Sequence, residues 1–138
     1  LLANATKADF GTAAAIATDA MTLFNIDAAN MMEAVDGITG VVNNSKFTIN
    51  DYKLALAQGG GVASAVGVEF DDFNTAIAGT SALFKSGSDA GTSFKTFLQR
   101  LIPQSAEAAG VMKELGLMTA EGSNQFYDAA GNLKDMNL

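Results

Sequence analysis

Apolar residues recur at helical spacing through most of this chain, but each stripe is interrupted after roughly 20 residues. Glycine, asparagine or proline stands at the interruptions, and these residues favour turns over continued helix. A long rod would need sustained periodicity, which the pattern lacks. The interrupted stripes therefore predict an all-α array of about six short amphipathic helices.

Capping signals set the expected boundaries of these helices. Three starts share one design, in which an apolar residue precedes a polar cap and acidic residues follow; the caps are Asn25, Thr48 and Glu69. Pro103 should end the fifth helix, because proline lacks an N–H group, and Ser105 should cap the sixth. The expected helices cover residues 7–24, 26–42, 49–66, 70–84, 92–102 and 106–115.

The charge of the chain is acidic and unevenly distributed. Of the net charge of −7, residues 1–84 carry three lysines against nine acidic residues, whereas residues 85–138 carry five basic against six acidic residues. Binding to duplex nucleic acid needs clustered cations, so this balance argues against specific nucleic-acid binding. The sequence also has no run of 18 apolar residues, which a simple membrane span requires.

The residue types that usually carry catalysis are scarce. The chain contains neither histidine nor cysteine, so serine and threonine nucleophiles lack their usual activators. Asp128, Gly131 and Asn132 resemble part of a calcium loop, but the other oxygen ligands and the distal glutamate of an EF-hand are missing. We therefore expect no enzyme activity, no catalytic residues, no cofactor and no metal site, and we interpret Asp128 as a turn former.

Small residues recur at every fourth position of the third expected helix. They are Ala55, Gly59, Ala63 and Gly67. This spacing lets two helix backbones approach closely and marks a candidate helix–helix or subunit contact. One interpretation is tight packing, or a break in the helix, inside a helical domain. The other is a subunit contact or a membrane-active segment, because residues 54–68 carry no charge.

The order of motifs after residue 90 is the most distinctive part of the chain. An Ala-Gly-Thr helix is followed by a proline, by a helix ending in Lys-Glu-Leu-Gly, and by an Asp-Ala-Ala-Gly turn between short apolar segments. The turn predicts a small C-terminal β-hairpin. The order resembles the core region of bacteriophage tail tape measure proteins, a class of minor tail protein. The positions that carry the motif are Gly91, Pro103, Leu115, Gly116, Asp128 and Gly131.

These patterns predict two parts in the chain. Residues 1–116 should form a helical module, with acidic helices over 1–84 and a helix–proline–helix unit over 85–116. Residues 117–138 should form an extended or hairpin tail. We expect the whole to be a fragment of a longer chain, as the resemblance implies.

The resemblance also implies a function. Tape measure proteins lie in the lumen of the phage tail, help to assemble it and set its length, and leave through the tip during genome ejection. Implied partners are further copies of the chain, tail tube proteins and tip or baseplate proteins, with the host membrane during ejection; synthesis is in the bacterial cytoplasm. The frequent breaks suggest a folded structural module rather than the measuring rod itself. The alternative is a membrane-perturbing helical module that aids DNA passage; a lytic enzyme domain would belong elsewhere in a longer parent.

Overall fold

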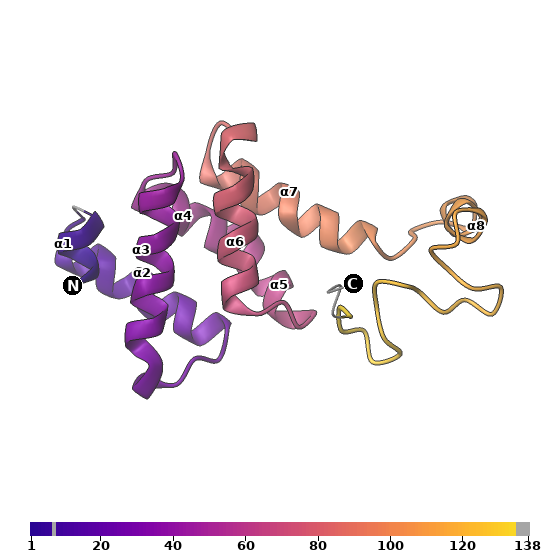
Figure 1. Ribbon diagram of the computed structural model, residues 1–138, viewed down its shortest axis with the longest axis horizontal. Helices are drawn as coiled ribbons and strands as arrows, with labels where there is room; N and C mark the ends of the chain where they lie inside the picture. Colours follow the sequence, from indigo (N-terminus) through magenta and orange to yellow (C-terminus); the bar gives the residue numbers. More distant parts are fainter. Residues whose placement is uncertain (7, 135–138) are drawn as a thin grey trace.

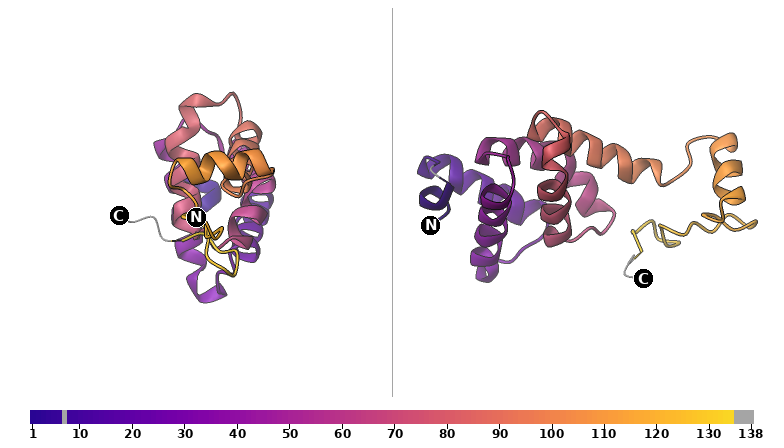
Figure 2. Two further views of the ribbon diagram at one scale, coloured as in Figure 1. Left: turned by 90° about the vertical axis from the view of Figure 1, so that its right-hand side faces the viewer. Right: turned by 45° about the horizontal axis from the view of Figure 1, so that its top comes forward.

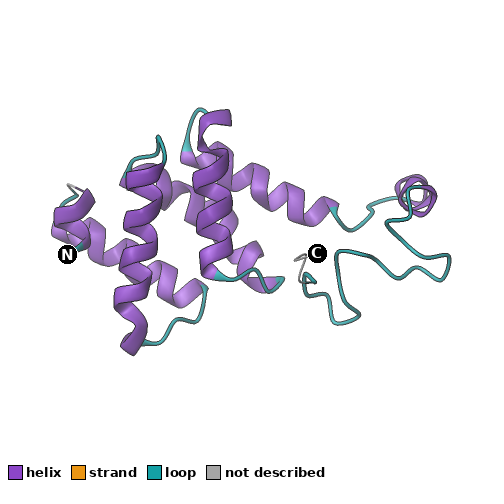
Figure 3. Ribbon diagram, viewed as in Figure 1, coloured by secondary structure: helices purple, strands orange, loops and turns teal. Residues whose placement is uncertain are grey.

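The computed structural model describes residues 1–6 and 8–134, and its regular elements there are all helical (Figures 1 and 3). The α-helices are α1 (Leu2–Thr6), α2 (Phe10–Leu23), α3 (Met31–Asn44), α4 (Ile49–Ala55), α5 (Gly61–Ala65), α6 (Phe70–Thr80), α7 (Gly87–Arg100) and α8 (Ala106–Glu114), with 3₁₀ turns η1 (Ala28–Asn30) and η3 (Ser81–Leu83) and one π-helical turn, η2 (Leu56–Gly60). The prediction of an all-α fold is confirmed for this part of the chain.

The helices form a body and an arm along the long axis of the molecule (Figure 1). Helices α1 to α6 pack together in the body, α7 lies against α4 and η2 and then runs outward, and α8 stands at the far end (Figure 2). After α8 the chain turns back towards α5, while the N-terminus lies at the opposite end of the long axis. The arm and the start of the body are therefore far apart within one chain.

An aromatic cluster occupies the core between the body helices and α7. Phe73 of α6 is fully buried, and its ring centroid lies 5.4 Å from that of Phe24 and 5.8 Å from that of Phe94. Beside it, the buried Tyr52 hydroxyl donates a hydrogen bond of 2.7 Å to Asn74 Oδ1. This network and the rings join α2, α4, α6 and α7, which fixes where α7 leaves the body.

The three predicted helix starts have different outcomes. Thr48 caps α4 in a complete capping box, in which its side chain accepts from the Asp51 N–H and Asp51 Oδ2 accepts from the Thr48 N–H. Glu69 occupies the N-cap position of α6 without a side-chain bond. The prediction for Asn25 was wrong: it has a left-handed backbone (φ 52°) after the end of α2, which asparagine tolerates, and η1 begins only after Asp27.

The starts of α2 and α7 differ from the predicted positions, because a polar cap, and not the apolar stripe, decides where each helix begins. Helix α2 begins at Phe10 rather than at residue 7, since Asp9 caps it by accepting from the Thr12 N–H at 2.9 Å, and α1 precedes it over Leu2–Thr6, where no helix was predicted. Helix α7 begins at Gly87, earlier than predicted, because Ser86 accepts from the Asp89 N–H at 3.2 Å. In both cases a local side-chain bond decides where the helix starts.

The predicted C-terminal β-hairpin is not seen in the described part of the tail. That part has only the isolated bridges Met118–Asn124 and Tyr127–Leu133. Asp128 Oδ1 accepts from the backbone N–H groups of Ala130 (2.9 Å) and Asn132 (2.8 Å), and the Asn132 N–H holds the pKa of the Asp128 carboxyl below its usual value. Side-chain bonds to Asp128 and backbone bonds between Asp128 and Asn132 close the turn, and in the described residues no strand ladder extends from it. The prediction for residues 135–138 lies outside the described residues.

Candidate functional site

Two glycines of α7 let this helix lie directly on the backbone of α4 and η2. A Cβ atom placed on Gly87 would overlap the Asp51 carbonyl oxygen, and one placed on Gly91 would overlap the Ala55 carbonyl oxygen. From the other side, a Cβ atom on Gly59 would lie 2.8 Å from the Gly91 carbonyl oxygen. Because both faces of the contact are bare backbone, neither helix accepts even a methyl group here.

This contact uses part of the small-residue stripe. Ala55 and Gly59 lie against α7, and Ala63, one turn further on, is also buried. Gly67 differs, because it follows the end of α5 with a φ of 82° and its N–H closes the helix by donating to the Ser64 carbonyl oxygen. The structure thus brings three of the four residues into the packed helix and leaves Gly67 at its exit.

The glycine run widens the helix without breaking it. Gly59 and Gly60 fall in the π-helical turn η2, which joins α4 to α5. A Cβ atom on Gly60 would lie 3.0 Å from Leu56 Cδ1 and 3.2 Å from Leu23 Cδ1, so leucine methyl groups occupy the space of the absent side chain. Consecutive glycines weaken the α-helical alternative by about 1 kcal/mol each, which favours the rarer turn.

Asp51 connects the two helices electrostatically. Its Oδ2 completes the capping box of α4, and its Oδ1 accepts a hydrogen bond of 3.1 Å from the Gly87 N–H at the start of α7. Partial burial acts to raise the pKa of the Asp51 carboxyl, but the N–H groups of Thr48 and Gly87 outweigh it and hold that pKa below its ordinary value. One carboxylate therefore satisfies backbone donors of two helices.

This geometry predicts acid sensitivity. Because the folded pKa of Asp51 lies below the ordinary value of 3.8, its carboxylate stabilises the fold above that value, and the stabilisation is lost as the pH falls through the folded pKa. Asp51→Asn should be less stable at neutral pH and lose less stability on acidification. Thermal unfolding followed across the acid range measures both effects. Thr48→Ser retains a cap and should keep the parental response; an Asp51→Asn variant with an unchanged acid response would contradict the assignment.

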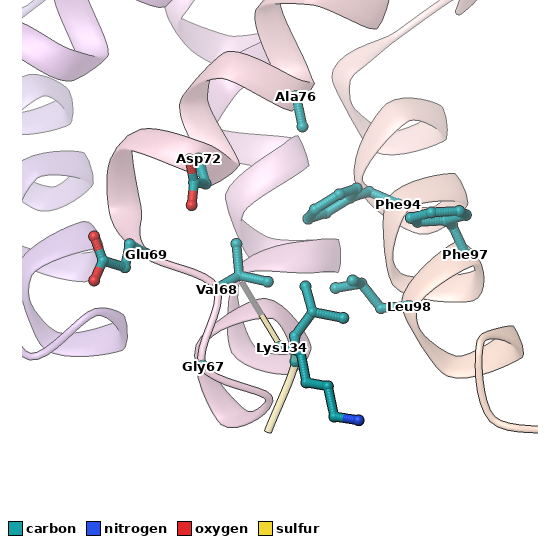
Figure 4. A pocket seen from close by; sticks show the side chains of 10 residues that line it. Gly67, Val68, Glu69, Asp72, Ala76, Phe94, Phe97, Leu98 and Lys134 are labelled. Carbon is teal, nitrogen blue, oxygen red and sulfur yellow. The ribbon is translucent and has the colours of Figure 1, made fainter. Parts of the chain in front are cut away.

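Two grooves flank Leu98 where the returning tail meets α7. The first groove, of about 580 Å³, lies between the start of α6 and the rings of Phe94 and Phe97, with Lys134 of the tail beside them (Figure 4). The second groove, of about 620 Å³, lies between α5 and the end of α7, and Arg100 is the one charged residue among the described residues that line it. Both grooves are open to solvent and partly apolar.

The tail forms one wall of both grooves, and hydrogen bonds hold it to the helices. They run from the Tyr127 hydroxyl to the Leu98 carbonyl oxygen (2.8 Å), from Asn124 Nδ2 to the Leu101 carbonyl oxygen (2.8 Å) and from the Leu133 N–H to the Val66 carbonyl oxygen (2.7 Å). Tyr127 is buried, and burial raises the pKa of its hydroxyl. The tail is therefore a strap (residues 117–134) that spans from α8 back to the body.

The residues of the C-terminal motif are distributed over these features. Gly91 lies in the close helix contact, Pro103 follows α7, and Gly116 (φ 71°) ends α8. Asp128 and Gly131 (φ 86°) form the turn of the strap. Leu115 is 67% exposed, and none of the residues of α8 is buried, because α8 stands away from the body.

Three residues of this site were not predicted from the sequence: Gly87, Asp51 and Tyr127. Gly87 was detectable, because Gly87 and Gly91 repeat the four-residue spacing of the stripe that they contact. Asp51 was recognisable as part of a Thr-x-x-Asp cap, but nothing local indicated its bond to α7. Tyr127 gave no signal, since its partner lies 29 residues earlier in the chain.

Comparisons with known proteins give one match. The sequence profile of a family described as phage-related minor tail protein matches residues 1–137. Searches of curated proteins and of solved structures gave no significant match. Within the described residues, no helix has the length and apolar character needed to cross a membrane. The matched range includes the body, the arm and the strap.

Proposed function

The chain belongs to the family of phage-related minor tail proteins, and we propose that it is a folded, non-catalytic module of a tape measure protein. The family supports a structural role in the phage tail and a place in the virion. The succession from Gly91 to Gly131, which resembles the core region of tape measure proteins, supports the finer assignment. In this proposal the parent protein occupies the tail lumen, contacts copies of itself, the tail tube and the tip, and acts in tail assembly, length determination and genome ejection.

The lengths of the helices support a module that is carried by the ruler. Helices α2, α3 and α7 each have 14 residues, which corresponds to about 21 Å at the rise of an α-helix. A measuring rod would instead need one helix that continues through the whole segment. The turns between these helices fold the segment back on itself. It therefore spans a shorter distance per residue than one continuous helix would.

No specific observation favours the membrane-perturbing alternative. The small residues of the uncharged stretch 54–68 already have partners within the chain, because Ala55 and Gly59 lie against α7. Exposing these residues to lipid would require α7 to separate from the backbone of α4 and η2. The proposal therefore remains with a structural role.

Duplication of residues 1–138 in the gene of the parent protein tests the proposal. If the segment were a continuous helical rod, the second copy would lengthen the tail by about 200 Å. A folded module should lengthen it by far less, because the added residues are compact. Electron microscopy of the tails gives the length. An uninterrupted helix of the same number of residues, inserted at the same place, is the control and should give the full increase.

Two results would contradict the proposal. Tails of normal length assembled without the parent protein would refute the tape measure assignment. An increase of the full rod length on duplication of this segment would refute the folded module.

A further inference from the structure

Phe10 is the most exposed of the large hydrophobic residues that the structure describes. Its side chain is 81% exposed at the first position of α2, next to the carboxylate of Asp9. An aromatic ring left in water loses roughly 2 kcal/mol of burial free energy, so a contact that covers it is favoured.

The second groove has the complementary character. Val62, Val66, Leu98 and Ile102 give it apolar walls, and Arg100 lies among its lining residues without an acidic residue beside it there. Its volume of about 620 Å³ is large enough for an aromatic side chain together with the flanking backbone. A ring with an adjacent carboxylate fits such a groove, because the ring can fill the apolar part while the carboxylate approaches the guanidinium.

One chain cannot join these two features within itself. Phe10 begins α2, which follows α1 in the body, whereas Arg100 is the last residue of α7, which runs outward from the body (Figure 1). The local charges are complementary, because Asp9 precedes Phe10 and Arg100 is the one charged residue among the described residues that line the second groove. A second copy of the chain therefore offers an occupant with both the required ring and the required charge.

We propose that Phe10 of one copy docks in the second groove of another copy, with Asp9 of the first facing Arg100 of the second. The contact joins the start of one body to the arm of the next, so it is heterologous and repeats head to tail. It rests on the self-association in the proposed function and names the surfaces that perform it. The exposed charge pair contributes less to association as the salt concentration rises, whereas screening of the repulsion between two copies of net charge −7 acts in the opposite direction.

Sedimentation velocity over a range of protein concentrations tests the contact. The chain of residues 1–138 should show a concentration-dependent mass, and Phe10→Ser or Arg100→Glu should weaken association at least about tenfold. Asp9→Asn keeps a capping side chain and should mainly reduce the salt dependence. Leu83→Ser is the matched control, because Leu83 is 79% exposed but lies outside the contact. Equal weakening by Leu83→Ser, or a monomer at every concentration, would overturn the proposal.

The absence of cysteine from the sequence permits a second test that gives the orientation. Ala14→Cys places a thiol one turn after Phe10, and Gln104→Cys places one on the lining of the second groove. Mixing the two variants under oxidising conditions should give a disulfide-linked pair more readily than either variant alone. Ala82→Cys mixed with Gln104→Cys is the control and should not. Preferential Ala14→Cys self-pairing would overturn the head-to-tail orientation, while the tail-length experiment would still decide the proposed function separately.

Discussion

Gly91→Ala is expected to lower the free energy of unfolding by about 3 kcal/mol, near the upper end of the usual cost of overpacking. The added methyl group would overlap the Ala55 carbonyl oxygen, and backbone cannot rotate away as a flexible side chain can. Alanine is the better helix former by about 1 kcal/mol, so propensity alone would predict stabilisation. Urea denaturation followed by circular dichroism measures the difference in the free energy of unfolding between the two proteins. A loss of stability indicates the overlap with backbone, whereas a gain would indicate helix propensity.

Gly40→Ala is the matched control for this variant. Gly40 is also inside a helix, α3, but a Cβ atom there meets nothing within 4 Å. We expect this variant to gain up to about 1 kcal/mol of stability, because only propensity changes. If Gly91→Ala behaved like Gly40→Ala, α7 would not lie on the backbone of α4.

Phe73→Ala should destabilise the chain most among single truncations of the core, by about 3–5 kcal/mol. The side chain is fully buried, and its ring contacts those of Phe24 and Phe94, so truncation leaves a cavity at the junction of three helices. Loss of the two ring pairs adds to the loss of buried area. The expected result is a large shift of the urea midpoint, with the arm helix α8 less affected because it buries nothing against this cluster.

Phe10→Ala makes the same chemical change at an exposed position. In dilute solution, where copies do not associate, this variant should change the free energy of unfolding by no more than about 0.5 kcal/mol. A similar loss for Phe10→Ala and Phe73→Ala would show that the aromatic cluster does not hold the body together.

Features encoded by a few neighbouring residues were predictable. The caps at Thr48 and Ser105 form as expected, because each joins a side chain to an N–H group three residues later. The all-α class was also predictable, because the apolar spacing of a helix is set by residues three and four positions apart. Asn25 shows the limit of such local signals, since a residue between two helices can serve the end of one or the start of the next.

Features set by distant segments were not predictable. The spacing of Ala55 and Gly59 indicated a close approach, but it could not identify α7 as the partner, whose Gly91 lies more than 30 residues later. The same applies to α8: the apolar spacing predicted an amphipathic helix over residues 106–115, yet the chain leaves the body before it, and Val111 is 54% exposed. The strap anchor at Tyr127 depends on a carbonyl group that any residue could present.

The strap also determines how the molecule responds to mechanical load. A pull applied at Lys134 acts first on the hydrogen bond between the Leu133 N–H and the Val66 carbonyl oxygen, and next on the Tyr127 anchor. Once these two and the bond from Asn124 Nδ2 to the Leu101 carbonyl oxygen have parted, the strap straightens and α8 can unwind without disturbing the aromatic cluster, because α8 buries no residue. The chain can thus lengthen under tension by releasing first the strap and then α8. The body stays folded until the load reaches the contact between the glycines of α7 and the backbone of α4.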